Sequence, residues 1–207
     1  MNTSNAKRLF EEALSYCEEI FKDELEWAKG VSQDTFKRVT ASKFLEEYCW
    51  VVYVMAFKVS TIDSIFPRLR KAFKNFDLDS LARMRSVSDV LSIFNNERKA
   101  DWFLKGSKAI AKEGFPKFKS RLKEQGMSVL EALPGIGPIS KFHLAKNIGF
   151  IDEAKPDRHL VRAAELCNAT VDELVTFLSG KYGLSRHVVD VVLWRYSADN
   201  RLGIQNS

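Results

Sequence analysis

The sequence predicts an all-α protein, because hydrophobic residues recur at helical spacing along most of the chain and no segment alternates as a strand does. Residues 6–28 place Leu9, Ala13 and Cys17 on one such stripe. Residues 42–57 begin amphipathic and become almost wholly apolar, which is typical of a helix in the middle of a bundle. We therefore expect about ten helices.

Shorter segments of helical periodicity follow, each closed by turn residues: 61–73, 77–84, 86–94, 97–114 and 115–126. Two later helix starts have the capping-box pattern, in which a Ser or Thr precedes a Glu by three residues. The pairs are Ser128 with Glu131 and Thr170 with Glu173. We expect each pair to cap the first turn of its helix.

The composition is that of an ordinary globular domain. The 207 residues can form one sizeable core or two small lobes. The longest apolar run, Cys49 to Phe57, is shorter than the roughly 18 residues that cross a membrane, and the first residues lack the apolar core of a signal peptide. The cysteines, Cys17, Cys49 and Cys167, are too far apart for a disulfide framework or an iron–sulfur or zinc motif. We expect a cytoplasmic protein without a metal centre.

Positive charge is concentrated in the middle of the chain. The net charge is +5, but residues 51–150 hold 18 Lys and Arg against 9 Asp and Glu, a net charge of +9. Solvated helix faces could carry this charge without any partner. An excess confined to one part of the chain favours a polyanion, because neutralised phosphates supply most of the non-specific affinity for nucleic acid.

The strongest local signal is the stretch Pro134-Gly-Ile-Gly-Pro138, between two segments of helical periodicity. Gly135 and Gly137 permit backbone angles closed to other residues and let another chain approach closely. Pro138 suits the first turn of the next helix. The pattern predicts a helix–hairpin–helix whose turn offers backbone N–H groups to a phosphate. A tight corner between helices, with no ligand, is the alternative.

A second signal is Asp157, which follows Pro156 and opens a helix that runs from residue 158. Aspartate is among the best N-cap residues, so capping alone could explain it. A helix N-terminus also lowers the pKa of a carboxylate and keeps it ionised. Such a carboxylate can orient water and stabilise an oxocarbenium ion, as cleavage of a glycosidic bond requires.

These residues resemble the signature of the helix–hairpin–helix base-excision DNA glycosylases (HhH-GPD fold), the superfamily of endonuclease III. The matching motifs are Leu133-Pro-Gly-Ile-Gly137 and Pro156-Asp-Arg-His159, followed by Arg162. The resemblance implies that Asp157 is the catalytic carboxylate, supported by His159 and Arg162. It also implies that the hairpin grips the DNA backbone, through Gly135, Ile136, Gly137 and Ile139. A structural monovalent cation at the hairpin is possible in this family.

The chain departs from the family pattern in two places. Members that also cut the strand have a Schiff-base lysine two residues after the second hairpin glycine, and this chain has Ile139 there. The iron–sulfur ligands of some members are missing as well. We therefore expect a monofunctional glycosylase, in which water steered by Asp157 displaces the base. The alternative is a bifunctional glycosylase and lyase, acting for example on 8-oxoguanine, with Lys141 as a displaced nucleophile.

The family flips the damaged base into a pocket and presses a wedge residue into the duplex. Candidates for the pocket or the wedge are Trp50, Tyr53, Phe57, Lys58, Trp102 and His143. The spacing of Trp50, Tyr53 and Phe57 predicts that they share one helix face. Aromatic faces would suit an alkylated purine, through stacking and cation–π attraction. The alternative is that most of these aromatic residues fill the core.

The resemblance further implies two helical lobes with a cleft between them. We expect residues 45–150 to form one lobe, which ends in the hairpin, and residues 1–44 and 151–207 to form the other. The expected partner is double-stranded DNA with a damaged base, bound by a monomer that is nucleoid-associated and does not contact membranes. A different class remains open, since helix–hairpin–helix units also serve as non-catalytic DNA anchors.

Overall fold

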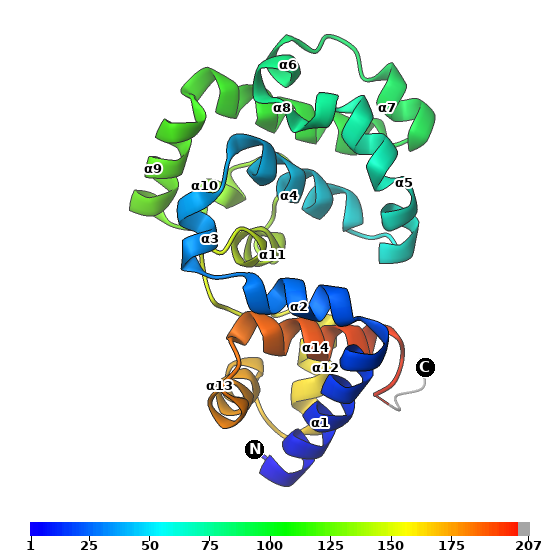
Figure 1. Ribbon diagram of the computed structural model, residues 1–207, viewed down its shortest axis with the longest axis vertical. Coiled ribbons are helices and arrows are strands. Elements are labelled where there is room, and N and C mark those ends of the chain that lie inside the picture. The colour runs from blue at the N-terminus through cyan, green and yellow to red at the C-terminus, as the bar shows by residue number, and fades with distance from the viewer. Residues whose placement is uncertain (203–207) are drawn as a thin grey trace. The chain divides into compact units, whose positions relative to one another are not determined.

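The computed structural model describes residues 1–202, and within that range it contains fourteen α-helices, one 3-10 helix and no strand (Figure 1). The all-α prediction is confirmed, but the expected number of about ten helices is too low. One reason is a break in the first amphipathic stretch, which forms α1 (Thr3–Ile20) and α2 (Lys22–Gly30). Phe21, between them, leaves helical geometry (φ −123°, ψ 36°), and both helices pack against α14 (Arg186–Ala198).

The chain divides into two compact units. The terminal unit combines Met1–Phe36 with the described residues from Gly149 onward, and the middle unit is Lys37–Ile148. The helix α3 (Gln33–Arg38) runs across the boundary. We expected a lobe boundary between residues 44 and 45, and this position lies inside α4 (Ala41–Val54). The helix begins earlier than expected because Thr40 caps it: the Thr40 hydroxyl accepts the N–H of Lys43 at 3.2 Å.

The terminal unit is built around α14, whose buried valines and leucine meet α1, α2, α12 (Arg158–Leu166) and α13 (Val171–Tyr182). The predicted capping box at the start of α13 is confirmed: the Thr170 hydroxyl accepts the N–H of Glu173, and the Glu173 carboxylate accepts the N–H of Thr170. The helix start predicted from the local sequence at Thr170 is therefore also the start of a helix that packs in this unit.

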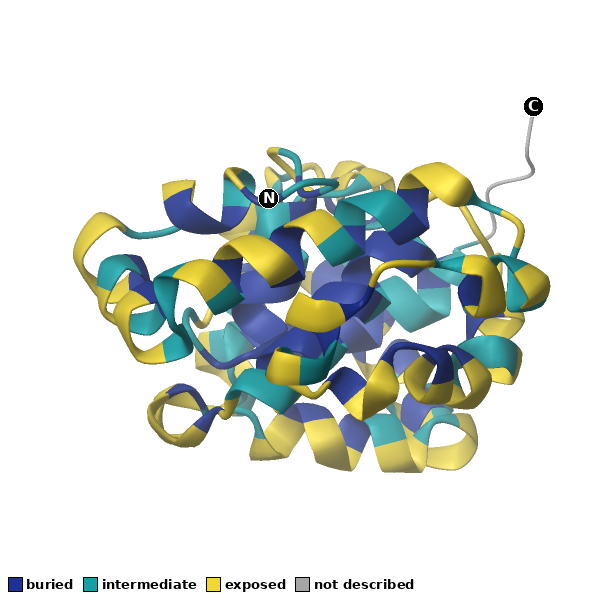
Figure 2. Ribbon diagram, turned by 90° about the horizontal axis from the view of Figure 1, so that it is seen from above, coloured by how far each residue is buried: buried dark blue, intermediate teal, exposed yellow. Residues whose placement is uncertain are grey.

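The middle unit surrounds α4, which has eight buried residues, as the apolar pattern of this segment predicts. Around it lie α5 (Val59–Ala72), η1 (Lys74–Phe76), α6 (Leu78–Arg83), α8 (Glu97–Glu113) and α11 (Ser140–Asn147). The remaining helices are α7 (Ser88–Ile93), α9 (Phe115–Gln125) and α10 (Ser128–Glu131). Most helices carry a buried stripe on one side and exposed residues on the other (Figure 2).

The capping box predicted at Ser128 is wrong. Ser128 is already inside α10, after Met127 in helical geometry, and its hydroxyl donates to the carbonyl of Gln125 at 2.9 Å. Glu131 instead forms an ion pair with Lys141. The Ser128 hydroxyl thus bonds to a backbone carbonyl of the preceding turn and does not cap a helix. Such local bonds to the backbone are the common alternative to capping for a short polar side chain.

None of the helices formed by residues 1–202 is long and apolar enough to cross a membrane.

Candidate functional site

The predicted hairpin lies between α10 and α11 and is anchored by Tyr48 of α4. The Tyr48 hydroxyl is 2.6 Å from the carbonyl oxygen of Pro134 and 3.1 Å from that of Trp102. Gly106 makes room for this ring, since a Cβ there would lie 2.3 Å from the hydroxyl oxygen. A buried side chain from a distant helix therefore fixes where the hairpin begins.

The two hairpin glycines differ. Gly135 has a φ of +81°, and a Cβ on it would lie 2.9 Å from Cε3 of Trp102, so both the backbone angle and the neighbour require glycine. Gly137 has no such positive φ, and a Cβ on it would meet no protein atom within 4 Å. The expectation of a special backbone angle holds for Gly135 and is wrong for Gly137, which instead leaves open space beside the turn.

Some hairpin N–H groups are used within the turn and others are not. The N–H of Ile136 donates to the carbonyl of Leu133, and the N–H of Gly137 donates to the Ser140 hydroxyl at 2.8 Å. Within the described chain, no partner accepts the N–H of Gly135, Ile139 or Ser140. The helix α11 has no side-chain cap, so its first turn keeps the free donors that an anion can accept.

The hairpin side chains point to different environments. Ile136 is buried, whereas Ile139 is 45% exposed. Lys141 places its Nζ 2.5 Å from Oε2 of Glu131. The Lys141 amine is thus engaged by a carboxylate of the preceding helix. His143, further along α11, is partly buried.

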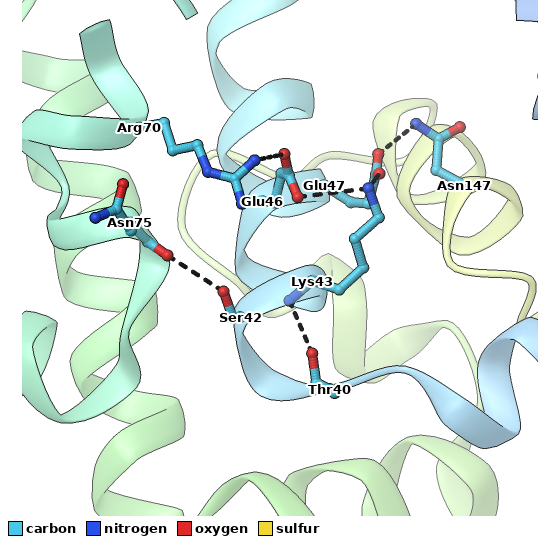
Figure 3. Close-up of polar contacts among 8 residues, drawn as sticks. All are labelled: Thr40, Ser42, Lys43, Glu46, Glu47, Arg70, Asn75 and Asn147. Atoms are coloured by element: carbon cyan, nitrogen blue, oxygen red, sulfur yellow. Dashed lines mark hydrogen bonds and ion pairs between the residues drawn. The ribbon is translucent and has the colours of Figure 1, made fainter. Parts of the chain in front are cut away.

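A buried polar network holds α11 against α4 (Figure 3). Glu47 is 7% exposed and accepts from Nδ2 of Asn147 at 3.0 Å, and Nζ of Lys43 lies 2.8 Å from its other oxygen. The neighbouring Glu46 pairs with Arg70 at 2.7 Å. A buried carboxylate must be paired to be tolerated, so this network fixes the helix that follows the hairpin. Our sequence analysis missed it, although a Glu within the apolar segment 42–57 is its visible sign.

Asp157 is the N-cap of α12, in the terminal unit. Its Oδ1 accepts the N–H groups of His159 at 2.9 Å and Leu160 at 3.3 Å. Its Oδ2 lies 2.8 Å from Nζ of Lys155. One carboxylate oxygen thus closes the helix, and the other faces an ammonium group.

This setting keeps Asp157 ionised. Burial by itself would raise the pKa of Asp157, but the Lys155 ammonium and the two N–H donors outweigh burial and hold the pKa below its ordinary value of 3.8. The loop before it is tied to α14: the Lys155 N–H donates to Asp190 at 3.1 Å, and the His187 N–H donates to Asp152 at 2.9 Å. Our sequence analysis did not single out Lys155. The pattern that could have indicated its role is a lysine separated by one proline from the capping aspartate.

His159 and Arg162 lie on α12 behind this carboxylate. Nε2 of His159 accepts from Arg158 at 3.3 Å, so the ring proton lies on Nδ1, which is 3.0 Å from the Ser197 hydroxyl. Burial, more than any neighbouring charge, lowers the pKa of His159 below its ordinary value. The ring is therefore neutral at neutral pH and serves to pack α12 against α14. Arg162 is partly buried.

The pocket candidates in α4 do not share one helix face. The helix ends at Val54, and Phe57 follows a residue with positive φ, Ala56 at +64°. Trp50 packs edge-on against Phe66, with ring centroids 5.1 Å apart. The prediction of one aromatic face is wrong because α4 stops before Phe57.

Tyr53 and Phe57 instead meet at Phe94, with centroids 5.8 and 4.9 Å from its ring. Tyr53 is fully buried, and its hydroxyl has no hydrogen-bond partner among the described residues. Phe57 is 39% exposed. Tyr53 thus lies in the core, whereas the ring of Phe57 is partly exposed to solvent.

A buried lysine supports this exposed ring. Lys99 of α8 is 5% exposed, and its Nζ donates to the carbonyls of Val52 at 2.5 Å and Met55 at 2.9 Å. The same nitrogen is 5.2 Å from the centroid of Phe57. Burial lowers the pKa of Lys99 to about 8. Sequence analysis missed Lys99; the sign is a lysine on the apolar stripe of α8, one turn before Phe103.

The other candidates of this unit lie at the hairpin and at the start of α5. Trp102 covers Gly135, and the guanidinium of Arg98 lies 5.0 Å from its ring centroid. Lys58 is exposed and precedes α5 without capping it.

No cluster of three or more metal-ligating side chains occurs among residues 1–202. A monovalent cation at the hairpin would need backbone carbonyls, and those of Leu133, Pro134 and Gly137 already accept hydrogen bonds. The cation therefore stays a prediction from the resemblance.

The chain was compared with known proteins. No protein-family model and no curated protein matches the sequence. Among solved structures, the chain is similar to the crystal structure of Methanocaldococcus jannaschii 8-oxoguanine glycosylase/lyase in complex with 15mer DNA containing 8-oxoguanine. The TM-score is 0.62 at 15% identity, over 97% of this chain and 100% of that one. The two proteins thus share their all-α fold.

Proposed function

We propose that this protein is a DNA glycosylase of base-excision repair, which hydrolyses the N-glycosidic bond of a damaged base in double-stranded DNA. The observation that carries the proposal is Asp157, a largely buried carboxylate kept ionised by Lys155 and by the N-terminus of α12. Its fold is shared with a DNA-bound glycosylase/lyase, and its sequence carries the hairpin and Pro-Asp motifs. These are independent supports, since one rests on tertiary structure and the other on local sequence.

In the proposed reaction the damaged base is first extruded from the duplex. The bond from C1′ to the base nitrogen then breaks, and positive charge develops on the sugar. The Asp157 carboxylate stabilises that charge and orients a water molecule. The water oxygen bonds to C1′, and its proton leaves with the base.

We propose that water, rather than a lysine of the hairpin, is the nucleophile for base removal. Residue 139 is isoleucine, and the amine of Lys141 is engaged by Glu131. The enzyme would thus be monofunctional in this step. His159 and Arg162 would support α12 behind Asp157.

The hairpin would hold a DNA phosphate through the N–H groups of Gly135 and Ile139, beside the open space at Gly137. The net charge of +9 in residues 51–150 would add non-specific affinity. We propose that Phe57, exposed and supported by Lys99, is the wedge or stacking residue, with Lys58 beside it.

The aromatic side chains of the middle unit bear on the choice of lesion. An alkylated purine would suit the aromatic side chains Phe57, Trp50 and Trp102 through stacking. The similar solved structure concerns an enzyme of 8-oxoguanine. We propose that the protein acts as a monomer in the cytoplasm on chromosomal DNA.

The test is base release from duplexes that carry, separately, alkylated adenine, hypoxanthine, uracil, 8-oxoguanine or an abasic site. Each is scored with and without alkali, for the unmutated protein and for Asp157→Asn. Alkali-dependent breaks that need Asp157 would establish the glycosylase and identify its lesion. No release from any lesion, with tight DNA binding intact, would instead identify a non-catalytic DNA anchor.

A further inference from the structure

An arginine lies over the tryptophan that covers the hairpin. The guanidinium carbon of Arg98, in the first turn of α8, is 5.0 Å from the ring centroid of Trp102. The same indole packs against Gly135, since a Cβ added there would lie 2.9 Å from Cε3 of the ring. The Tyr48 hydroxyl is within hydrogen-bond distance of the carbonyl oxygens of Trp102 and Pro134, and so ties α8 to the hairpin. One indole therefore contacts both a guanidinium and the hairpin turn.

The guanidinium of Arg98 keeps its hydrogen-bond donors. Contact with an aromatic ring uses the face of the guanidinium plane, whereas its five N–H groups point outward within that plane. The Arg98 side chain is exposed, and no group of residues 1–202 accepts a hydrogen bond from it. The carboxylate of Asp101, three residues along α8, is paired with Lys105 at 2.9 Å. Glu97 precedes Arg98 directly, and successive residues of a helix point about 100° apart. Arg98 thus presents an unpaired cation whose plane the indole orients.

The first turn of α8 adds backbone donors beside this cation. The Asn96 side chain caps the helix by accepting the N–H of Lys99 at 3.1 Å. Within the described chain, no partner accepts the N–H groups of Glu97 and Arg98. The positive end of a helix of 17 residues therefore lies next to the Arg98 guanidinium.

We propose that Arg98 and the start of α8 form a second phosphate site, which binds a neighbouring phosphate of the DNA strand held by the hairpin. A guanidinium holds a phosphate through two parallel N–H···O bonds, and Trp102 keeps the guanidinium in place by cation–π attraction. Phosphates of one strand follow one another every 3.4 Å or so, that is about 3.4 Å, along the helix axis, so two sites that share one indole suit neighbouring phosphates. The inference rests on the proposed function, because that function places a DNA phosphate at the hairpin.

A second site changes what the hairpin can do. Free N–H groups at one turn can hold any phosphate of a strand, and the strand can still rotate about that point. Two fixed phosphate contacts on the same strand determine the register and the orientation of the duplex. Arg98 would thus position the DNA, without reading its sequence.

The experiment measures the affinity for a duplex that carries one stable abasic analogue. An abasic nucleotide lacks the stacking that holds a normal base, so it gives the complex a defined register. One phosphate at a time is replaced by a neutral methylphosphonate. We expect the unmutated protein to lose affinity at two neighbouring positions of one strand. In Arg98→Ala the loss should vanish at one of these positions and persist at the other.

The salt dependence tests the same contact without any mapping. Arg98→Ala should weaken binding by about 10-fold and reduce the slope of log affinity against log salt by about 1. Arg98→Lys keeps the charge but loses the paired donors, so it should keep the slope and lose about 3-fold in affinity. The matched control is Arg85→Ala, which removes the same charge from an exposed arginine of the same unit, between α6 and α7. This control should lose less than about 2-fold and remain sensitive at both methylphosphonate positions.

The outcomes separate the second phosphate site from the proposed function. Equal affinities and salt slopes for Arg98→Ala and Arg85→Ala would overturn the site and leave the glycosylase intact. A loss in Arg98→Ala that depends on the base opposite the abasic position, with an unchanged salt slope, would also overturn it, because Arg98 would then contact a base. If the unmutated protein neither binds the duplex nor releases base from any lesion duplex, the proposed function fails as well.

Discussion

Two helices of this protein follow a proline closely, and they begin in opposite ways. After Pro138, α11 begins with no side-chain cap, and no partner within residues 1–202 accepts the N–H groups of Ile139 and Ser140. After Pro156, α12 begins with Asp157, whose carboxylate accepts two N–H groups of the first turn. The uncapped start leaves its first N–H donors without a partner in the described chain, whereas the capped start uses its donors to keep a carboxylate ionised.

Under the proposed function, one structural unit, a turn followed by a helix, would serve binding at α11 and chemistry at α12, according to whether the helix has a side-chain cap. A phosphate needs N–H groups that nothing else occupies. A charged carboxylate that is largely buried needs those groups, and here also Lys155, to remain charged. The following substitutions test that division of roles.

The largest effect should come from Asp157→Asn. Asparagine caps a helix about as well as aspartate does, so α12 should persist. The negative charge is lost, and we expect base release to fall by about 10³-fold. Single-turnover release measures this, with DNA affinity as the control. A variant that releases base at the normal rate would remove Asp157 from the chemistry.

The two hairpin glycines should respond in opposite ways. Gly135→Ala must keep a positive φ and displace Trp102, so we expect the free energy of unfolding to fall by about 1–3 kcal/mol. Gly137→Ala meets no protein atom and should change stability by less than about 0.5 kcal/mol. Its methyl group should instead crowd a bound phosphate and weaken DNA binding by about 10-fold.

Urea unfolding and DNA titrations of these two variants distinguish the effects. Equal losses of stability would contradict the geometry of the turn. Unchanged DNA affinity in Gly137→Ala would argue against phosphate binding at this point.

The pH profile of base release should depend on Lys155. Because the pKa of Asp157 is lowered, its carboxylate and the stability it contributes persist above its unfolded pKa and are lost as the pH falls through the lowered value. In Lys155→Met burial remains but the ammonium is gone, so the pKa should rise. We expect the acid limb of activity to move up by about 1–2 pH units. Alkali-scored release between pH 4.5 and 8 (roughly the range in which such a shift shows) measures this, and an unmoved limb would contradict the charge pairing.

The smallest changes in stability are expected at the two predicted capping boxes, of which the one at Thr170 forms and the one at Ser128 does not. Thr170→Ala removes the half of the α13 capping box in which the Thr170 hydroxyl accepts the N–H of Glu173, and it should cost about 1 kcal/mol. Ser128→Ala loses only a bond to the preceding turn and should cost less than about 0.5 kcal/mol. Thermal unfolding of the pair, followed by circular dichroism, is sufficient. Equal losses of stability in the two variants would mean that the hydrogen bonds formed at Thr170 and absent at Ser128 do not decide the contribution of the residue.

The features that the sequence predicted well are local. Helical periodicity, the cap at Thr170 and the position of Asp157 before α12 each depend on residues within a turn or two of one another. The same local logic failed at Ser128, where the chain was already helical, and at Phe57, where α4 had already ended. Periodicity shows which residues can share a face, but it does not show where the helix stops.

By itself, then, the sequence determined the all-α class, the hairpin and the capped aspartate, because backbone propensity and capping act over a few residues. Only the tertiary structure decided which charges are paired and buried. Glu47 meets Asn147 from 100 positions away, and Lys99 meets Val52 from 47. The physical reason is that burial makes an unpaired charge or amide costly, so each acquires a partner that packing brings close and that no local pattern reveals.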